Sequence, residues 1–384
     1  MLLSRLVSVV MVTDMCREET LKSILSEYYR YNYSKIYKPN SIDGREFGFN
    51  FFGGSFKRHI GFKVFEEYVN YIQRMVPKDV YYSIATYLEP TRPMNEKGWV
   101  NAELPFDLDA EQLLKTSDEL IKSGWISQSV YEQIKQRFLY LLEDFIEADF
   151  GLDEKDYMLV FSGGRGYHIR VLVEPYINLD QKLRRQIVEY VSIGYKPSEP
   201  IKANVFQPFP HDYGWSRKLF EYIRVMGQSQ LEELGLSSDL TAKRVISAFR
   251  KAKNPSSVRL NRSEFTSMQK LLDFVLGSYT VAVDERVTVD INRLLRAPGT
   301  VHGGSGLVCK AITKNDLEGF DPFRHASMEN VSRKRVHVKR VPFEVVINDE
   351  SVSPELNGKE VELNSALAYY VVVRGGGDFV DEAV

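Results

Sequence analysis

Apolar side chains at the start of the chain change from helical to strand-like spacing. Between residues 18 and 33 they recur at i, i+3, i+4 and i+7, which predicts one face of a helix. The four residues in this pattern are Leu21, Ile24, Leu25 and Tyr28. Residues 45–49 and 56–62 instead alternate, so they predict two strands that could pair across the intervening turn.

The same patterns along the rest of the chain predict an α/β (α+β) core that is split by a helical insertion. Helices are predicted at 64–75, in two pieces around 110–122 and 129–148, and over most of 179–274. Strands are predicted at 81–87, 104–108, 157–160, 168–173, 279–283 and near Leu307, and the chain is basic and then β-rich from Arg333. The predicted core comprises residues 1–178 and 276–384, and the predicted insertion is 179–275. The sequence shows no internal repeat.

Composition is ordinary for a globular protein of 384 residues, with 43% hydrophobic and 27% charged residues. The formal net charge is -2, so any nucleic-acid site must be a local patch rather than a property of the whole surface. Two basic segments, 243–262 and 333–340, are candidates for template or duplex contacts. Charge runs are often only a solvated face of a protein, and the sequence leaves both interpretations open.

Two cysteines, Cys16 and Cys309, cannot build a disulfide framework or a zinc site, and they favour a reducing cytoplasm. The apolar run at 6–12 is far shorter than the roughly 20 residues that span a bilayer. No small-residue cleavage site follows this run, which disfavours a signal peptide. We therefore expect a cytoplasmic protein that does not act at a membrane.

One predicted strand ends in the sequence Phe106-Asp107-Leu108-Asp109. Because side chains alternate along a strand, Asp107 and Asp109 share one face while the two apolar residues face the core. Two carboxylates on one face repel, and a divalent cation relieves that repulsion; Mg²⁺ takes one or two carboxylates together with waters and phosphates. The alternative is a solvated strand end at which Asp109 caps the helix that follows.

Three glycines lie between two predicted strands, in the segment Ser162-Gly163-Gly164-Arg165-Gly166-Tyr167-His168. Glycines let the backbone approach an anion closely and expose its N–H groups. The side chains of Ser162, Arg165 and His168 add donors that suit a triphosphate. The alternative is a glycine-rich hairpin, since the segment lacks the lysine of a Walker loop and does not match the dinucleotide-binding fingerprint.

A third group of polar residues lies between Asp284 and His302. Asp284 follows the strand predicted at 279–283, so its carboxylate could meet the first pair across a sheet. Arg296 and His302 would bring donors near it. In the alternative, Asp284 caps a turn and Arg296 pairs with a surface acid, and the segment alone does not decide between the two.

In their order along the chain, these segments resemble the small, catalytic subunit of the archaeal and eukaryotic DNA primase family. The matching segments are Arg45-Glu46-Phe47, Arg58-His59, Phe106 to Asp109, Ser162 to His168, and Asp290 to His302. The match runs from about Ile42 to Leu307. The resemblance implies a primase-type core with mixed sheets flanked by helices, and template-directed nucleotidyl transfer that makes short RNA or DNA primers on single-stranded DNA.

The resemblance also implies roles for individual residues. Asp107, Asp109 and Asp284 would bind two Mg²⁺ or Mn²⁺ ions, and Asp290 is a rival for the third place. The residues implied to bind the incoming nucleotide are Ser162, Gly163, Arg165, His168, Arg296 and His302, with Glu46 and Arg58 lining the same site. The implied partners are a large primase subunit in a heterodimer, a single-stranded DNA template and nucleoside triphosphates.

The sequence departs from the family pattern in two places. Many members carry a Cys/His zinc module near the catalytic aspartates, but residues 110–150 contain neither residue type, so no zinc is predicted. Gly304 stands where some archaeal relatives have a lysine, which would remove one phosphate contact.

Three other functions stay open at this point. A stand-alone primase-polymerase of a mobile element or a repair pathway would use the same catalytic fold, and co-purification with a large iron–sulfur partner would argue against it. A phosphodiesterase could use the same carboxylates but has no need of a triphosphate cradle. A non-catalytic nucleic-acid-binding or scaffold subunit would have no reason to hold three uncompensated carboxylates.

Overall fold

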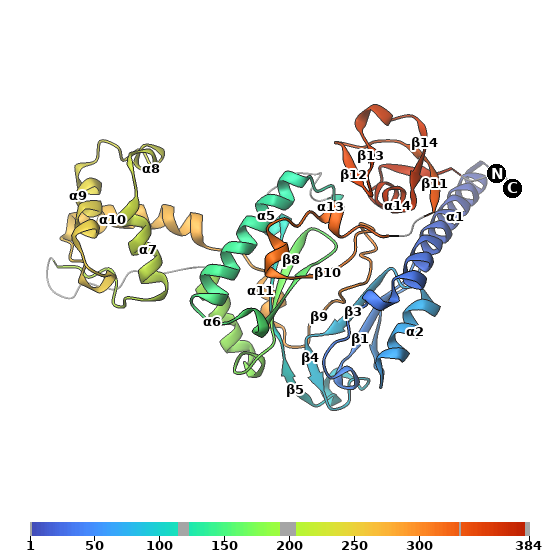
Figure 1. Ribbon diagram of the computed structural model, residues 1–384, viewed down its shortest axis with the longest axis horizontal. Coiled ribbons are helices and arrows are strands. Elements are labelled where there is room, and N and C mark those ends of the chain that lie inside the picture. The colour runs from blue at the N-terminus through green and yellow to red at the C-terminus, as the bar shows by residue number, and fades with distance from the viewer. Residues whose placement is uncertain (1, 114–122, 193–204, 330–331, 381–384) are drawn as a thin grey trace. The chain divides into compact units, whose positions relative to one another are not determined.

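The computed structural model describes residues 2–113, 123–192, 205–329 and 332–380. The chain divides into two compact units. One unit consists of Met1–Arg185 and Val283–Val384, and the other of Gln186–Ala282. The sheets belong to the first unit, and the second, at the left of Figure 1, is built mainly of helices.

Two four-stranded sheets form the centre of the first unit (Figure 1). The first has the order β2 (Lys57–Ile60), β1 (Phe47–Asn50), β3 (Asp79–Ser83) and β9 (Leu294–Arg296). The second has the order β10 (Lys310–Ile312), β7 (Tyr157–Phe161), β8 (Gly166–Val171) and β6 (Leu104–Asp109). A separate pair joins β4 (Ala85–Tyr87) to β5 (Trp99–Ala102). Every pairing between described strands is antiparallel, and the α+β class is confirmed.

Helices of the first unit begin with α1 (Leu2–Tyr31) and α2 (Phe65–Met75). Helix α5 (Gln128–Tyr140) packs on β6 and β8 because Tyr131, Ile134 and Phe138 lie on one face of it and are buried. A π-helical segment, Leu141–Glu147, continues α5. The remaining helices are α3 (Ala110–Leu113), α6 (Gln181–Ser192, which crosses into the second unit), α11 (Glu285–Val289), α12 (Lys314–Leu317) and α13 (Pro322–His325). Short 3₁₀ turns lie at Tyr33–Lys35, Ile42–Gly44, Met94–Glu96, Glu154–Asp156 and Tyr176–Asn178.

Residues 333–380 form a small β-rich module around one buried helix. Strand β11 (Arg333–Val338) pairs with β14 (Glu360–Asn364) and β15 (Gly377–Phe379). The hairpin of β12 (Val345–Ile347) and β13 (Glu350–Val352) and the 3₁₀ turn Pro354–Leu356 complete it. The module is β-rich as predicted, but the prediction missed α14 (Ser365–Val373). This apolar segment is helical because Asn364 caps the Leu367 N–H and because burial on all sides suits a helix without a polar face.

The second unit packs four further helices around an apolar centre. They are α7 (Gly214–Val225), α8 (Gln228–Glu233), α9 (Leu240–Lys251) and α10 (Arg262–Tyr279), with a 3₁₀ turn at Pro255–Ser257. The side chain of Asp239 caps α9, and a capping box of Asn261 and Glu264 begins α10. Phe220 and Phe249 stack at the contact between α7 and α9.

Several predicted elements need correction. The strand at 279–283 is wrong: α10 continues to Tyr279, and the residues after it are extended but pair with no strand in the described chain. The strand at 81–87 is two strands in different sheets, because the N–H of Ile84 turns to the carbonyl of Arg293. Near Leu307 the structure has only an isolated bridge between Val301 and Val308 before β10 begins. Most of the helix predicted at 110–122 lies outside the described residues.

The helix predicted at 18–33 is part of the longer helix α1, which begins at Leu2. The other predicted helices and strands of the first unit are confirmed within a few residues. The apolar run at 6–12 is part of α1. None of the helices that the structure describes has the length and the apolar character needed to cross a bilayer.

Candidate active site

A cavity of about 400 Å³ opens between the two central sheets of the first unit. Seven of the residues predicted for the site line it: Asp107, Asp109, Ser162, Arg165, His168, Arg296 and His302. Tyr81, Arg293 and Arg374 also contribute to its wall. The fold therefore gathers at one place residues as far apart in the sequence as Tyr81 and Arg374.

The carboxylate pair lies on the cavity face of β6. The β6–β8 register sets Asp107 directly opposite His168 and Asp109 opposite Gly166, while Phe106 and Leu108 are fully buried on the other face. The Nε2 atom of His168 lies 3.1 Å from Oδ1 of Asp107. The strand alternation read from the sequence is thus confirmed, and it exposes both carboxylates to the cavity.

Asp109 is both a helix cap and a member of this pair. Its Oδ1 accepts the backbone N–H of Glu111 at 2.9 Å, as the capping interpretation requires. Its Oδ2 lies 3.3 Å from Nε of Arg165, whose Nη1 lies 2.9 Å from Glu111. Burial raises the pKa of Asp109, and the nearby carboxylates of Asp107 and Glu111 add to this rise. The ionised form of Asp109 is therefore under-compensated by the protein alone.

Asp284 lies beside the pair through its backbone. Its N–H donates to the carbonyl oxygen of Asp107 at 3.0 Å. The strand predicted at 279–283, directly before Asp284, does not form. Its carboxylate Oδ1 accepts the N–H of Arg286 and caps α11. Asp290 ends that helix, and its carboxylate accepts the N–H of Asn292. Neither Asp284 nor Asp290 is among the residues that line the cavity.

The glycine-rich turn is fixed from three directions. Oγ of Ser162 accepts the N–H groups of Gly164 and Gly166 at 3.2 and 3.3 Å, so its own proton can point to a ligand. The hydroxyl of Tyr131 donates to the carbonyl of Gly164. Gly163 has φ +76°, and a Cβ atom there would lie 2.9 Å from Cβ of His302, so only glycine fits without strain. Gly163 therefore shapes the turn rather than lining the cavity.

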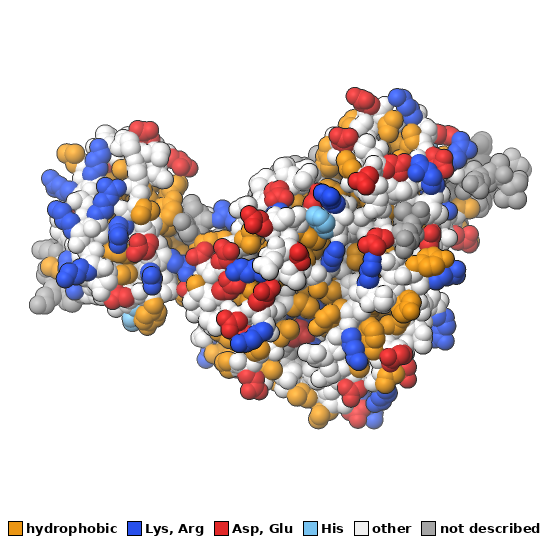
Figure 2. Space-filling view, viewed as in Figure 1, with side chains coloured by type: hydrophobic (Ala, Val, Ile, Leu, Met, Phe, Trp, Pro, Cys, Tyr) orange, Lys and Arg blue, Asp and Glu red, His pale blue; other side chains and the backbone are white. Residues whose placement is uncertain are grey.

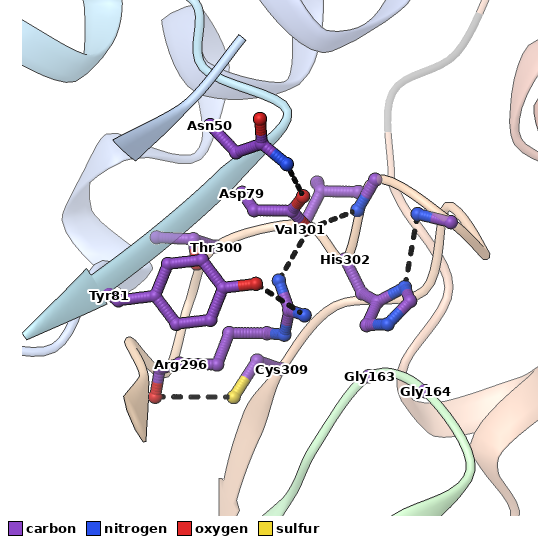
Figure 3. Close-up of polar contacts among 12 residues, drawn as sticks. Asn50, Asp79, Tyr81, Gly163, Gly164, Arg296, Thr300, Val301, His302 and Cys309 are labelled. Atoms are coloured by element: carbon purple, nitrogen blue, oxygen red, sulfur yellow. Dashed lines mark hydrogen bonds and ion pairs between the residues drawn. The ribbon is translucent and has the colours of Figure 1, made fainter. Parts of the chain in front are cut away.

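Arg296 enters the cavity from β9 as part of a buried ion pair (Figure 3). Its Nη1 lies 2.5 Å from Oδ1 of Asp79, and its Nη2 donates to the hydroxyl of Tyr81 at 3.1 Å. The two charged side chains are only 11% and 10% exposed, so the surface ion pair considered from the sequence is wrong. Burial works against ionised Asp79, but Arg296, His302 and the N–H of Gly303 lower its net pKa.

His302 lies next to this pair and above the glycine turn (Figure 3). Burial and the charge of Arg296 lower the pKa of His302 well below its usual value, so the ring is neutral at neutral pH. The N–H of Gly304 donates to Nδ1 at 3.1 Å, which leaves the ring proton on Nε2. That nitrogen is the one on the Gly164 side, where it can donate to an anion.

Glu46 and Arg58 are tied to each other and do not line the cavity. Nε and Nη2 of Arg58 donate to the two oxygens of Glu46 at 2.8 and 3.1 Å, and Lys97 donates at 2.5 Å. Burial works to raise the pKa of Glu46, but these hydrogen bonds and the N–H of His59 outweigh it and lower the pKa. The nucleotide-binding roles implied for both residues stay predictions.

The residues present fit a divalent cation in part. In the described part of the chain, no three His, Cys, Asp or Glu side chains are arranged as a ready ligand set. Two carboxylates on one strand face, one with a raised pKa, nevertheless suit an ion that fills its other positions with waters and phosphate oxygens. Asp284 is joined to Asp107 by one backbone hydrogen bond, while its own carboxylate caps α11.

An antiparallel α+β core whose cavity combines paired carboxylates with phosphate-type donors is typical of enzymes that act on nucleoside phosphates. A sequence profile described as DNA primase small subunit matches residues 106–313. The chain belongs to this family.

Curated relatives match over nearly the whole length. The chain is 31% identical to "DNA primase small subunit PriS" of Methanococcoides burtonii, over 95% of this chain and 99% of the relative. It is 29% identical to the protein of the same name from Picrophilus torridus, over 93% and 97%. For that from Methanosarcina barkeri the identity is 30%, over 94% and 96%. The family resemblance seen in the sequence motifs is confirmed.

Two residues at or beside the cavity had not been expected from the sequence. Asp79 stands just before the predicted strand and carries no motif, and only the fold brings it to Arg296, 217 residues later. Arg374 follows α14 and lies in none of the motifs of the sequence analysis. In both cases the signal is a long-range contact, which no local pattern contains.

Proposed function

We propose that this chain is the catalytic subunit of a DNA primase, which joins nucleoside triphosphates into short RNA or DNA primers on single-stranded DNA. The names of its relatives support the primase assignment. The observation that carries the proposal is one cavity in which the carboxylates of Asp107 and Asp109 face donors from Ser162, Arg296 and His302.

Asp107 and Asp109 would hold the catalytic cations, with Asp284 as the third carboxylate. Bound there, Mg²⁺ or Mn²⁺ would activate the primer 3′-hydroxyl and neutralise the charge of the departing pyrophosphate. His168 would keep the Asp107 carboxylate oriented through its Nε2 contact. Arg165 would balance the charge of Asp109.

A set of donors in the same cavity would bind the triphosphate. The hydroxyl of Ser162 and the Nε2–H of neutral His302 are hydrogen-bond donors, and Arg296 adds a fixed positive charge. Such fixed donors stabilise charge that develops on phosphate oxygens without having to reorganise. This donor set disfavours a phosphodiesterase, which has no need to bind a free triphosphate.

The relatives' names describe a small subunit, which implies a larger partner. We propose that a large primase subunit completes the enzyme. A stand-alone primase-polymerase stays the alternative, and co-purification of a large subunit distinguishes the two. The absence of zinc and the cytoplasmic location stay predictions.

The second unit is the better candidate for the template contact. Its segment 186–282 holds 13 Lys and Arg against 9 Asp and Glu, although the whole chain has a net charge of -2. The basic residues of segment 243–262 are all exposed, and blue side chains gather on the visible face of this unit (Figure 2). These residues are Lys243, Arg244, Arg250, Lys251, Lys253, Arg259 and Arg262.

Segment 333–340 is largely neutralised by neighbouring acids. Arg333 lies 2.8 Å from Glu350, Arg335 lies 3.3 Å from Glu360, and Lys339 pairs with Asp378. We therefore favour a solvated charged face for this segment.

The direct test is extension of an annealed primer by one nucleotide, with Mg²⁺ or Mn²⁺, by the wild type and by Asp107→Ala. We expect the variant to lose at least about 100-fold in rate, since electrostatic stabilisation is a large part of such catalysis. A matched control is Asp378→Ala, which removes an exposed carboxylate outside the cavity. Near-full activity of Asp107→Ala would overturn the assignment.

A further inference from the structure

One arginine of the cavity wall comes from outside the segment that matches the family profile. The profile ends at residue 313, whereas Arg374 follows directly after α14 in the C-terminal module. Arg374 lines the same cavity as Arg165, Arg296 and His302.

Arg374 is held by well-packed structure. Its backbone N–H closes the last turn of α14 on the carbonyl of Tyr370, and its carbonyl accepts the indole N–H of Trp125 at 3.1 Å. On the same helix, the hydroxyl of Tyr369 donates to the carbonyl of Gly303, the residue after His302. The helix that carries Arg374 is therefore fixed to the loop that carries His302.

The guanidinium of Arg374 occupies a narrow slot. Gly124 has φ +88°, and a Cβ atom built on it would lie 1.6 Å from Nη1 of Arg374, so the absence of a side chain there makes room for the guanidinium. Cζ of Arg374 lies over the ring of Tyr370, 5.5 Å from the ring centroid.

Two N–H donors of Arg374 have no acceptor in hydrogen-bond geometry among the described residues, although the Tyr370 hydroxyl interacts with the guanidinium. Nε and Nη2 of Arg374 are shielded from solvent and have no hydrogen-bond partner among the described residues. Arg165 and Arg296, in contrast, are each paired with carboxylates. A shielded donor without an acceptor is costly, and a charged planar fork matches phosphate oxygens best.

The position of Arg374 indicates which phosphates it contacts. The α-phosphate must react next to the carboxylates of Asp107 and Asp109. The basic side chain beside them, Arg165, forms an ion pair with Asp109. Arg374 pairs with no carboxylate in the described chain, and the helix before it is tied to the His302 loop by the hydrogen bond from the Tyr369 hydroxyl to the carbonyl of Gly303. Arg374 therefore lies on the His302 side of the cavity.

We propose that Arg374 is a nucleotide-binding residue that binds the β- and γ-phosphates of the incoming nucleoside triphosphate. The inference rests on the proposed function of the cavity. It makes the C-terminal module part of the nucleotide site, because α14 supplies one arginine and supports the loop of His302.

The test compares the affinities of ATP and AMP, measured by calorimetry with Mg²⁺ on the full chain, for wild type, Arg374→Gln and Arg374→Lys. We expect Arg374→Gln to weaken ATP binding about tenfold, as for the loss of a charge-assisted hydrogen bond, and AMP binding less than about twofold. Arg374→Lys keeps the charge but not the fork and should lie between. Lys339→Gln, an exposed cation of the same module, is the matched control and should bind like the wild type.

Two results would overturn the inference: unchanged ATP affinity in Arg374→Gln, or an equal loss for ATP and AMP, which would indicate a damaged cavity. Thermal denaturation identifies a variant that fails to fold, and Arg374→Lys then decides through its ATP-to-AMP ratio. If the wild type binds ATP and AMP equally weakly, the proposed function of the cavity fails first. If the wild type prefers ATP and Arg374→Gln retains that preference, only the role of Arg374 fails.

Discussion

Replacing Asp79 by Asn removes one charge from the buried ion pair that holds Arg296. Asp79 accepts from Arg296 at 2.5 Å and from the N–H of Gly303 at 2.8 Å, and both charged side chains are about nine-tenths buried. Removing one partner of a buried pair typically costs about 3–5 kcal/mol, because the other charge is left uncompensated. An Asn side chain has the size of Asp79 and can still accept the N–H of Gly303. We therefore expect the free energy of unfolding to fall by an amount near the lower end of this range, about 3 kcal/mol.

The assay is thermal and urea denaturation of Asp79→Asn beside the wild type. A loss of about 3 kcal/mol corresponds to a Tm lower by roughly 4 °C for a chain of 384 residues, because the unfolding entropy is about 2.1 cal/mol/K per residue. The control is Asp378→Asn, which breaks an ion pair whose side chains are about half exposed and should change stability by less than about 1 kcal/mol. Nucleotide affinity should fall in Asp79→Asn and not in the control.

The pH dependence gives a second readout. Because the pKa of Asp79 is lowered in the folded state, its contribution to stability is present above the ordinary aspartate pKa of about 4 and is lost as the pH falls through the folded value. The stability difference between wild type and Asp79→Asn should therefore shrink in acid. A variant as stable as the wild type at neutral pH would refute the importance of this pair.

Three further predictions concern the carboxylates, the turn and the second unit. The pKa of Asp109 is raised, so its ionised form destabilises the folded state above that pKa. Asp109→Asn should therefore be at least as stable as the metal-free wild type at pH 7. Mn²⁺ should raise the Tm of the wild type and not that of the variant. Gly163→Ala should lose about 1–3 kcal/mol in denaturation, because of its positive φ and its contact with His302, and a neutral outcome would contradict the close approach. The double variant Lys243→Gln/Lys251→Gln should bind single-stranded DNA with a weaker salt dependence: the slope of log affinity against log salt concentration should fall in magnitude by roughly 1.4. The control Lys359→Gln should leave this slope unchanged. An unaltered slope in the double variant excludes these two lysines as phosphate contacts.

The part of the site that the sequence predicts is the part encoded by local patterns. Strand alternation is enough to put Asp107 and Asp109 on one face, and the strand forms as its apolar residues require. The glycine turn is also encoded locally, because the positive φ of Gly163 and its close contact with His302 require a glycine at this position.

The missed features depend on contacts between distant segments. The residues at 279–283 have strand-like composition, but no strand among the described residues pairs with them. Asp284 instead contacts Asp107 through one backbone hydrogen bond. The apolar segment of α14 has β-branched residues, yet burial on every side favours a helix. Asp79 became recognisable only once β3 and β9 were paired.

The central claim is that this cavity synthesises primers, and the most direct measurement is de novo synthesis on single-stranded DNA. Labelled nucleotides, Mg²⁺ or Mn²⁺ and a large primase subunit would be supplied to the wild type and to Asp109→Ala. The account predicts new short oligomers from the wild type and none from the variant. Equal product from both would contradict the metal-site assignment, and no product from either would favour a binding or scaffold role for this chain.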